Sequence, residues 1–133
     1  MKVLFDTNVL IAAFIAHGTS SEVFDHCLSE HSIFTSQWIL DELEEKLTKK
    51  FRFHESKVNN IIKFIDANSE MVEPARLNEN VCRDRDDDNV LAAALEAKAD
   101  CIVTGDKDLL ILKNFRGIKI ISPSDFWEFE VKR

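Results

Sequence analysis

Apolar residues along the chain fall into two alternating patterns, short continuous runs and longer stretches with helical spacing. The short runs are bounded by polar or turn residues and are typical of buried strands. They predict strands at residues 2–5, 32–35, 71–72, 100–104 and 118–121. The longer stretches predict helices at residues 9–16, 19–28, 37–49, 56–68, 88–98 and 106–112, and a last helix after Ser122-Pro123.

The helix predicted at residues 37–49 shows the pattern most clearly. Its apolar stripe, with spacings of three and four, consists of Ile39, Leu40, Leu43 and Leu47. Ser36 precedes the helix and is a favourable N-cap. Strands that alternate with such helices predict a parallel sheet covered on both faces. We therefore expect an α/β fold, a three-layer α/β/α sandwich with a central parallel sheet, in one domain over residues 1–133.

Composition narrows the class of protein. Of the 133 residues, 45% are hydrophobic, enough for a packed core and against intrinsic disorder. No apolar run approaches the roughly 20 residues needed to span a bilayer, and the N-terminal residues do not resemble a signal peptide. Three widely spaced cysteines, Cys27, Cys82 and Cys101, predict neither disulfides nor a thiolate zinc site. A reduced, cytoplasmic setting is expected, without membrane contact.

Acidic residues gather where predicted strands end and helices begin. Asp6 follows the first strand, Asp106 follows the strand at 100–104, and Asp84, Asp86, Asp87 and Asp88 crowd before an apolar helix. The carboxyl ends of parallel strands share one sheet edge, where sites form. Carboxylates that meet there repel one another unless a cation holds them, and oxygen ligands suit Mg²⁺ or Mn²⁺. The pattern predicts metal-dependent phosphoryl or phosphodiester chemistry.

Each acid also has a purely structural interpretation. Asp6, Asp106 and Asp108 suit helix caps and turns, and acids before a helix are favoured by its dipole, by about 0.3–1 kcal/mol each. Four acids in five positions exceed what capping requires, and Asp88 directly adjoins the apolar helix. On the helix after Ser36, Glu42 and Glu44 both flank the apolar stripe, and periodicity does not choose between them.

Taken together, several stretches resemble the PIN domain, the ribonuclease fold of many bacterial and archaeal toxin–antitoxin systems. The stretches that carry the resemblance are residues 6–10, 36–43, 83–94 and 102–109, with a family-like ending at 120–126. They span nearly the whole chain in order. The chain has Asp84-Arg85-Asp86-Asp87 where part of the family has Asp-Pro-Asp-Asp.

The resemblance implies a set of site residues. It places the four metal-binding and catalytic acids on Asp6, Glu42, Asp88 and Asp106, and so favours Glu42 over Glu44. Supporting roles, in orienting metal ligands or water, are expected for Thr7, Asn8, Asp84, Asp87, Thr104 and Asp108.

The implied activity is hydrolysis of RNA phosphodiester bonds with Mg²⁺ or Mn²⁺, by a toxin that pairs with an antitoxin protein and forms a homodimer. The formal net charge of −7 argues against tight, non-specific RNA binding. Two alternatives remain: a PIN-like module that binds RNA or protein without cleaving, or processes RNA, and a phosphatase or receiver-like domain. Aspartyl-phosphate phosphatases carry a second Asp two positions after the first, where this chain has Asn8.

Overall fold

The computed structural model of the protein describes residues 1–77, 80–82 and 84–133. Within these residues the strands are β1 (Lys2–Phe5), β2 (Ser32–Ser36), β3 (Glu70–Val72), β4 (Cys101–Val103), β5 (Asn114–Phe115) and β6 (Ile118–Ile121). The helices are α1 (Thr7–Ile15), α2 (Thr19–Glu30), α3 (Gln37–Lys49), α4 (Glu55–Ala67), α5 (Arg85–Ala97), α6 (Lys107–Leu110), the 3₁₀ turn η1 (Pro123–Asp125) and α7 (Phe126–Lys132). Arg83, the first residue of the third predicted motif, lies outside the described residues.

The strands form a single sheet in the order β3-β2-β1-β4-β6-β5 over the described chain. Every pairing is parallel except that of β5 with β6. In the centre of the sheet, Leu4 of β1 lies in register with Phe34 of β2 on one side and Ile102 of β4 on the other. The ends of β1, β2 and β4 therefore open onto one edge, as the sequence predicts.

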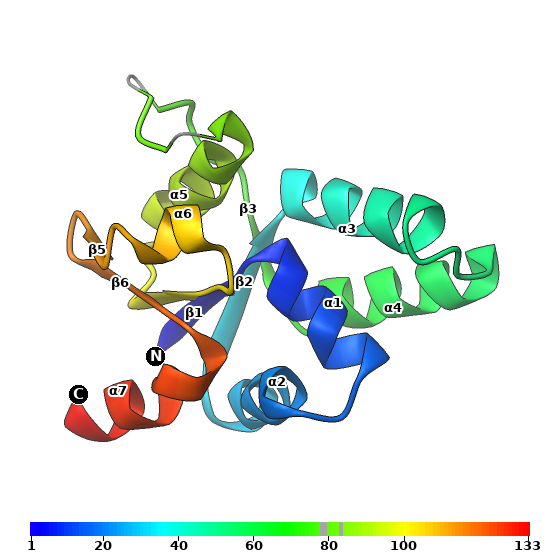
Figure 1. Cartoon of the computed structure of the whole chain (residues 1–133), viewed down its shortest axis with the longest axis horizontal. Helices are drawn as coiled ribbons and strands as arrows, with labels where there is room; N and C mark the ends of the chain where they lie inside the picture. Colours follow the sequence, from blue (N-terminus) through cyan, green and yellow to red (C-terminus); the bar gives the residue numbers. More distant parts are fainter. Residues whose placement is uncertain (78–79, 83) are drawn as a thin grey trace.

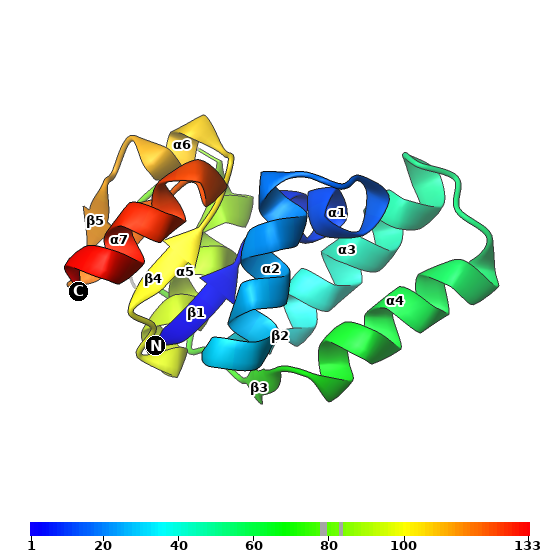
Figure 2. The same cartoon turned by 90° about the horizontal axis from the view of Figure 1, so that it is seen from below.

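Helices cover both faces of this sheet (Figures 1 and 2). The two views place α2 and α7 on one face and α5 on the other, with β1 and β4 between them. The strands are buried on both sides: Val3, Leu4 and Phe5 of β1 are at most 1% exposed. This arrangement confirms the predicted α/β class with its three layers.

The small strand β5 was not predicted, and it makes the sheet mixed rather than wholly parallel. It joins β6 through a two-residue turn, Arg116-Gly117, whose φ angles are 50° and 88°. Positive φ at both central residues is the geometry of the tight turns that best fit the twist of a hairpin. Since β5 has only two residues, hydrophobic periodicity gives no signal for it.

Helix α5 begins at Arg85, three residues earlier than predicted. Its N-cap is Asp84, whose Oδ1 accepts a hydrogen bond from the backbone N–H of Asp86 at 2.9 Å. The acidic cluster therefore forms the first turn of the helix and does not precede it. As a result, each acid points in a direction set by helical geometry.

The three cysteines are unpaired and buried, as expected for small core residues. Burial raises the pKa of the Cys27 and Cys101 thiols to about 12, so both stay protonated near neutral pH. None of the helices in the described part of the chain is both long and apolar enough to cross a membrane.

Ser36 caps α3 as predicted, since its Oγ accepts a hydrogen bond from the N–H of Ile39 at 3.2 Å. Replacing Ser36 by Ala is expected to lower the free energy of unfolding by about 1 kcal/mol, because this buried N–H loses its partner. Urea denaturation measures the change. Ser29→Ala, at an exposed serine in α2, is the matched control, with an expected change within about 0.5 kcal/mol. Equal losses in both variants would contradict the capping role.

Candidate metal centre

Asp6 stands at the junction of β1 and α1 and is 4% exposed. Its Oδ1 accepts a hydrogen bond from the N–H of Thr7 at 2.8 Å, and its Oδ2 accepts one from the hydroxyl of Thr104 at 2.7 Å. The cap and the buried hydroxyl fix the carboxylate at the end of the central strand. Thr104, for which the family resemblance implies a supporting role, thus contacts Asp6 directly.

Asp106 lies beyond the end of β4, the strand that pairs with β1. It caps α6, because its Oδ1 accepts from the N–H of Asp108 at 2.8 Å. Its own backbone N–H donates to the Thr104 hydroxyl oxygen at 3.0 Å. Thr104 therefore joins the two acids, by donating to Asp6 and accepting from the backbone of Asp106.

Asp87 comes from the opposite direction, in the first turn of α5, and is 6% exposed. Its Oδ2 is buried and has no hydrogen-bond partner in the described part of the chain. One carboxylate oxygen from each of Asp87, Asp106 and Asp108 lies within 4.8 Å of the others. Three oxygens so close together are the donor set that a hard divalent cation prefers.

Electrostatics show that these carboxylates face one another. Burial, followed by the charges of Asp106, Asp6 and Asp84, raises the pKa of Asp87 to about 7. The pKa of Asp6 is also raised, chiefly by burial. The hydrogen bonds from Thr104 and Thr7 oppose this rise, whereas the charges of Glu42 and Asp106 add to it. Like charges held together in this way are relieved by a bound cation or by a proton.

Asp88 points elsewhere. Its two oxygens accept backbone hydrogen bonds from Val81, at 3.3 Å, and Cys82, at 2.8 Å. The side chain thereby fastens the segment before α5. The prediction that Asp88 is the third acid differs from this placement, which brings Asp87 to the other acids instead.

Neighbouring positions on a helix point about 100° apart, which explains the difference between Asp87 and Asp88. A signal for Asp87 was present in the sequence. Leu91 and Ala94, four and seven positions later, are both 0% exposed, so Asp87 continues the buried stripe of α5. The family resemblance places the third acid on Asp88 because it precedes the apolar run, and this adjacency does not report the direction of a side chain.

Glu42 on α3 lies close enough to Asp6 for its charge to raise the pKa of that residue. Its Oε1 is 3.8 Å from the Nζ of Lys46, one helical turn further along. The same Nζ donates to the Oδ1 of Asn8 at 3.3 Å. Lys46 thus connects Glu42 to the start of α1.

Of the remaining supporting residues, Thr7 is buried, and its hydroxyl has no hydrogen-bond partner among the described residues. Asp84 acts through its cap of α5 and through its charge on Asp87. The structure therefore brings Asp6, Glu42, Asp87, Asp106 and Asp108 to one edge of the sheet. The orphaned oxygen of Asp87 and the crowded carboxylates fit a bound Mg²⁺ or Mn²⁺ ion.

Comparison with known proteins agrees with the fold. The uncharacterised protein MJ1680 of Methanocaldococcus jannaschii is 37% identical over 142 residues, which cover 96% of this chain and 90% of that protein. Among solved structures, the crystal structure of VapBC2 from Rickettsia felis bound to a DNA fragment from their promoter has a similar fold. The TM-score is 0.66 at 14% identity, over 90% of this chain and 97% of the other. The model of the PIN domain matches residues 2–108, and this chain belongs to the PIN domain family.

Proposed function

We propose that this protein is an endoribonuclease that depends on Mg²⁺ or Mn²⁺ and hydrolyses RNA phosphodiester bonds. The observation that carries the proposal is Asp87, a buried carboxylate with an orphaned oxygen that meets Asp106 and Asp108 at the sheet edge. A divalent cation at such a site activates water for attack and stabilises negative charge that builds up on the phosphate.

The chain's own residues hold this site in place. Thr104 and the N–H of Thr7 orient Asp6, and the cap of α6 orients Asp106. Carboxylates fixed by buried partners need little reorganisation when a cation arrives, which is the advantage of a preformed site. Asp87 completes the set from the opposite side of the edge, in the role first predicted for Asp88.

Lys46 adds the positive charge that an acidic site needs in order to accept a polyanion. Its ammonium lies between Glu42 and Asn8 at the margin of the acids, and its side chain is 34% exposed. An ammonium in this position is suited to contact an RNA phosphate next to the scissile bond. The net charge of the whole chain is −7, which is unfavourable to RNA, and we expect binding to weaken strongly with salt.

The biological role that we propose is that of a toxin paired with an antitoxin protein. The support is membership of the PIN family together with the fold shared with a chain of the VapBC2 complex. Induced expression is expected to arrest growth, and co-expression of a partner encoded next to it is expected to restore growth. Arrest that persists in the Asp6→Asn variant would contradict a role for the site in toxicity.

The test of the activity is cleavage of a mixed RNA pool by the purified chain with Mg²⁺, with Mn²⁺ and with EDTA. Cleavage is expected with either cation and is expected to stop with EDTA or in Asp6→Asn, which removes charge but little volume. Single-stranded DNA of the same sequences is the control substrate and is expected to remain intact. Cleavage that survives both EDTA and the substitution would overturn the proposal. Cation binding without cleavage of any RNA would favour the non-catalytic binding module.

A further inference from the structure

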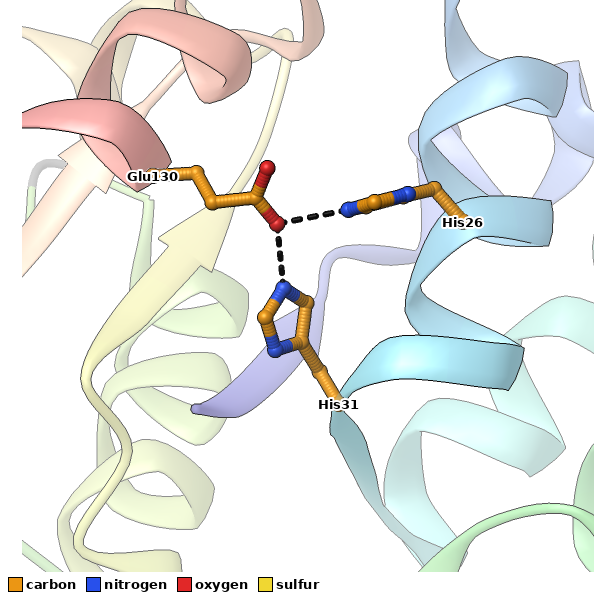
Figure 3. A group of neighbouring side chains, drawn as sticks. All are labelled: His26, His31 and Glu130. Atoms are coloured by element: carbon orange, nitrogen blue, oxygen red, sulfur yellow. Dashed lines mark hydrogen bonds and ion pairs between the residues drawn. The ribbon is translucent and has the colours of Figure 1, made fainter.

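A second group of side chains of the types that can bind metals lies away from the acids, at the opposite edge of the sheet. His26 belongs to α2, His31 immediately precedes β2, and Glu130 belongs to α7 near the C-terminus. His31 stands where β2 begins, whereas the acids stand where the parallel strands end. Figure 3 shows the three side chains pointing toward one another from these separate elements.

The contacts converge on a single atom. The Oε2 of Glu130 lies 2.6 Å from the Nε2 of His26 and 2.5 Å from the Nε2 of His31. Charge-assisted N–H···O bonds are usually about 2.7–2.9 Å long, so the two ring nitrogens lie closer to this oxygen than in ordinary hydrogen bonds. The Nδ1 of His31 lies 3.0 Å from the nitrogen of Met1, so both nitrogens of that ring have polar neighbours.

We propose that His26, His31 and Glu130 bind a transition-metal ion of the Zn²⁺ type. Two imidazole nitrogens and one carboxylate form the donor set of many zinc sites, in which three protein ligands leave one coordination position open. Imidazole suits Zn²⁺, Co²⁺ and Ni²⁺, whereas Mg²⁺ prefers oxygen ligands only. The two sites of this chain are thus expected to take different metals.

The geometry admits such an ion with small movements. One donor atom from each of the three residues lies within 4.8 Å of the others. Ligands at about 2.0–2.2 Å from Zn²⁺ stand roughly 3.4 Å apart in a tetrahedron, so the carboxylate must withdraw by less than about 1 Å. Glutamate achieves this by rotation within its flexible side chain.

The surroundings favour metal binding over a merely solvated cluster. His26 packs edge-on against Trp127, with ring centroids 5.0 Å apart, and His31 against Phe126, at 6.0 Å. These rings hold the imidazoles in orientation and exclude part of the solvent. The side chains of His26, His31 and Glu130 remain 30%, 11% and 26% exposed, so an ion and a water molecule can enter.

Glu130 supplies the carboxylate of the group, and its Oε2 lies next to both ring nitrogens. A bound ion would tie α7 to α2 and to the start of β2. It would thus fasten the C-terminal helix to the rest of the fold.

The experiment is a calorimetric titration of the EDTA-stripped chain with Zn²⁺ in excess Mg²⁺, which occupies oxygen sites but does not compete for imidazole. We expect one equivalent of Zn²⁺ to bind and to raise the midpoint of thermal unfolding. Both His26→Gln and Glu130→Gln are expected to weaken binding by at least about tenfold, the loss that even indirect partners of metal ligands cause. Circular dichroism establishes whether each variant is folded. If His26→Gln is unfolded, the Zn²⁺ affinity of Glu130→Gln alone tests the proposal.

Two control variants distinguish Zn²⁺ binding at this group from binding at another histidine or at the acidic site. His17→Gln replaces an exposed histidine outside the group and is expected to bind Zn²⁺ as the wild type does. Asp87→Asn alters the acidic site and is expected to leave Zn²⁺ binding intact, so failure of the proposed nuclease would not affect this result. Absence of Zn²⁺ binding in the presence of Mg²⁺ would overturn the proposal, as would a Zn²⁺ affinity of Glu130→Gln equal to that of the wild type. The three side chains would then form a hydrogen-bonded cluster without metal.

Discussion

Replacing Asp87 by Asn is expected to lower the rate of RNA cleavage roughly a thousandfold, since metal-ion catalysis supplies several kcal/mol and each 1.4 kcal/mol is about tenfold in rate. The substitution keeps the shape of the side chain but removes the charge of the buried carboxylate that faces Asp106. Single-turnover cleavage at saturating Mg²⁺ measures the chemical step apart from RNA binding. Calorimetry with Mg²⁺ is expected to show weakened cation binding in the same variant.

Asp88→Asn is the matched control, one residue away and of identical chemistry. Asp88 accepts backbone hydrogen bonds from Val81 and Cys82, so it acts on the site only by holding the segment before α5. The rate of RNA cleavage is expected to fall by no more than about tenfold. This is the lower end of the losses caused by replacing residues that act on a metal site through its ligands. The opposite ranking, with Asp88→Asn the more damaging change, would restore the assignment made from sequence and contradict the placement of Asp87.

Without divalent cations, the protein is expected to lose stability as the pH rises from 5 to 8. The pKa of Asp87 is about 7 in the folded protein, against 3.8 for an aspartate free in solution. Between these values the folded state holds a proton that the unfolded state has released. This contribution to the free energy of unfolding is therefore complete below about pH 4 and is lost as the pH passes 7. The raised pKa of Asp6 acts in the same direction.

The size of this loss follows from the shift and from solvent screening at the sheet edge. One pKa unit corresponds to about 1.4 kcal/mol, and screening reduces the effect of the whole shift to about 1–2 kcal/mol. Urea unfolding at pH 5 and pH 8 in EDTA, compared between wild type and Asp87→Asn, isolates the contribution of Asp87. Mg²⁺ is expected to restore the wild type at pH 8 and to affect the variant less. The same pH dependence in both proteins would contradict strong repulsion at this site.

Most of the fold was predictable because its elements are long and periodic. The predicted apolar stripe of α3 and its cap at Ser36 are confirmed, since 3.6-residue spacing and a capping serine are local signals. The hairpin of β5 and β6 is not predicted by the sequence. Two residues carry no periodicity, and the turn at Arg116-Gly117 is defined by positive φ angles that only the structure shows. The order of strands is set by contacts that are distant in sequence.

The site shows the same division between local and distant information. Asp6 and Asp106 were identifiable because each follows a strand directly, and the strand fixes where its end lies. The sequence indicates only a supporting role for Asp87, because the four neighbouring aspartates are chemically identical and differ only in the direction of their side chains. Their directions depend on where α5 begins, and the cap by Asp84 sets that start. The contact of Lys46 with Asn8 joins residues 38 positions apart, and a single sequence contains no signal for it.

The hydrogen bond from Thr104 to Asp6 joins residues 98 positions apart, and this separation sets the order of events during synthesis. A ribosome releases β1 and β2 long before β4, although β4 is the neighbour of β1 in the finished sheet. Until Thr104 and Asp106 emerge, Asp6 has neither the hydroxyl that fixes it nor the second acid beside it. A nascent chain therefore carries an incomplete acidic centre until residues 104–108 have been added and have left the ribosome.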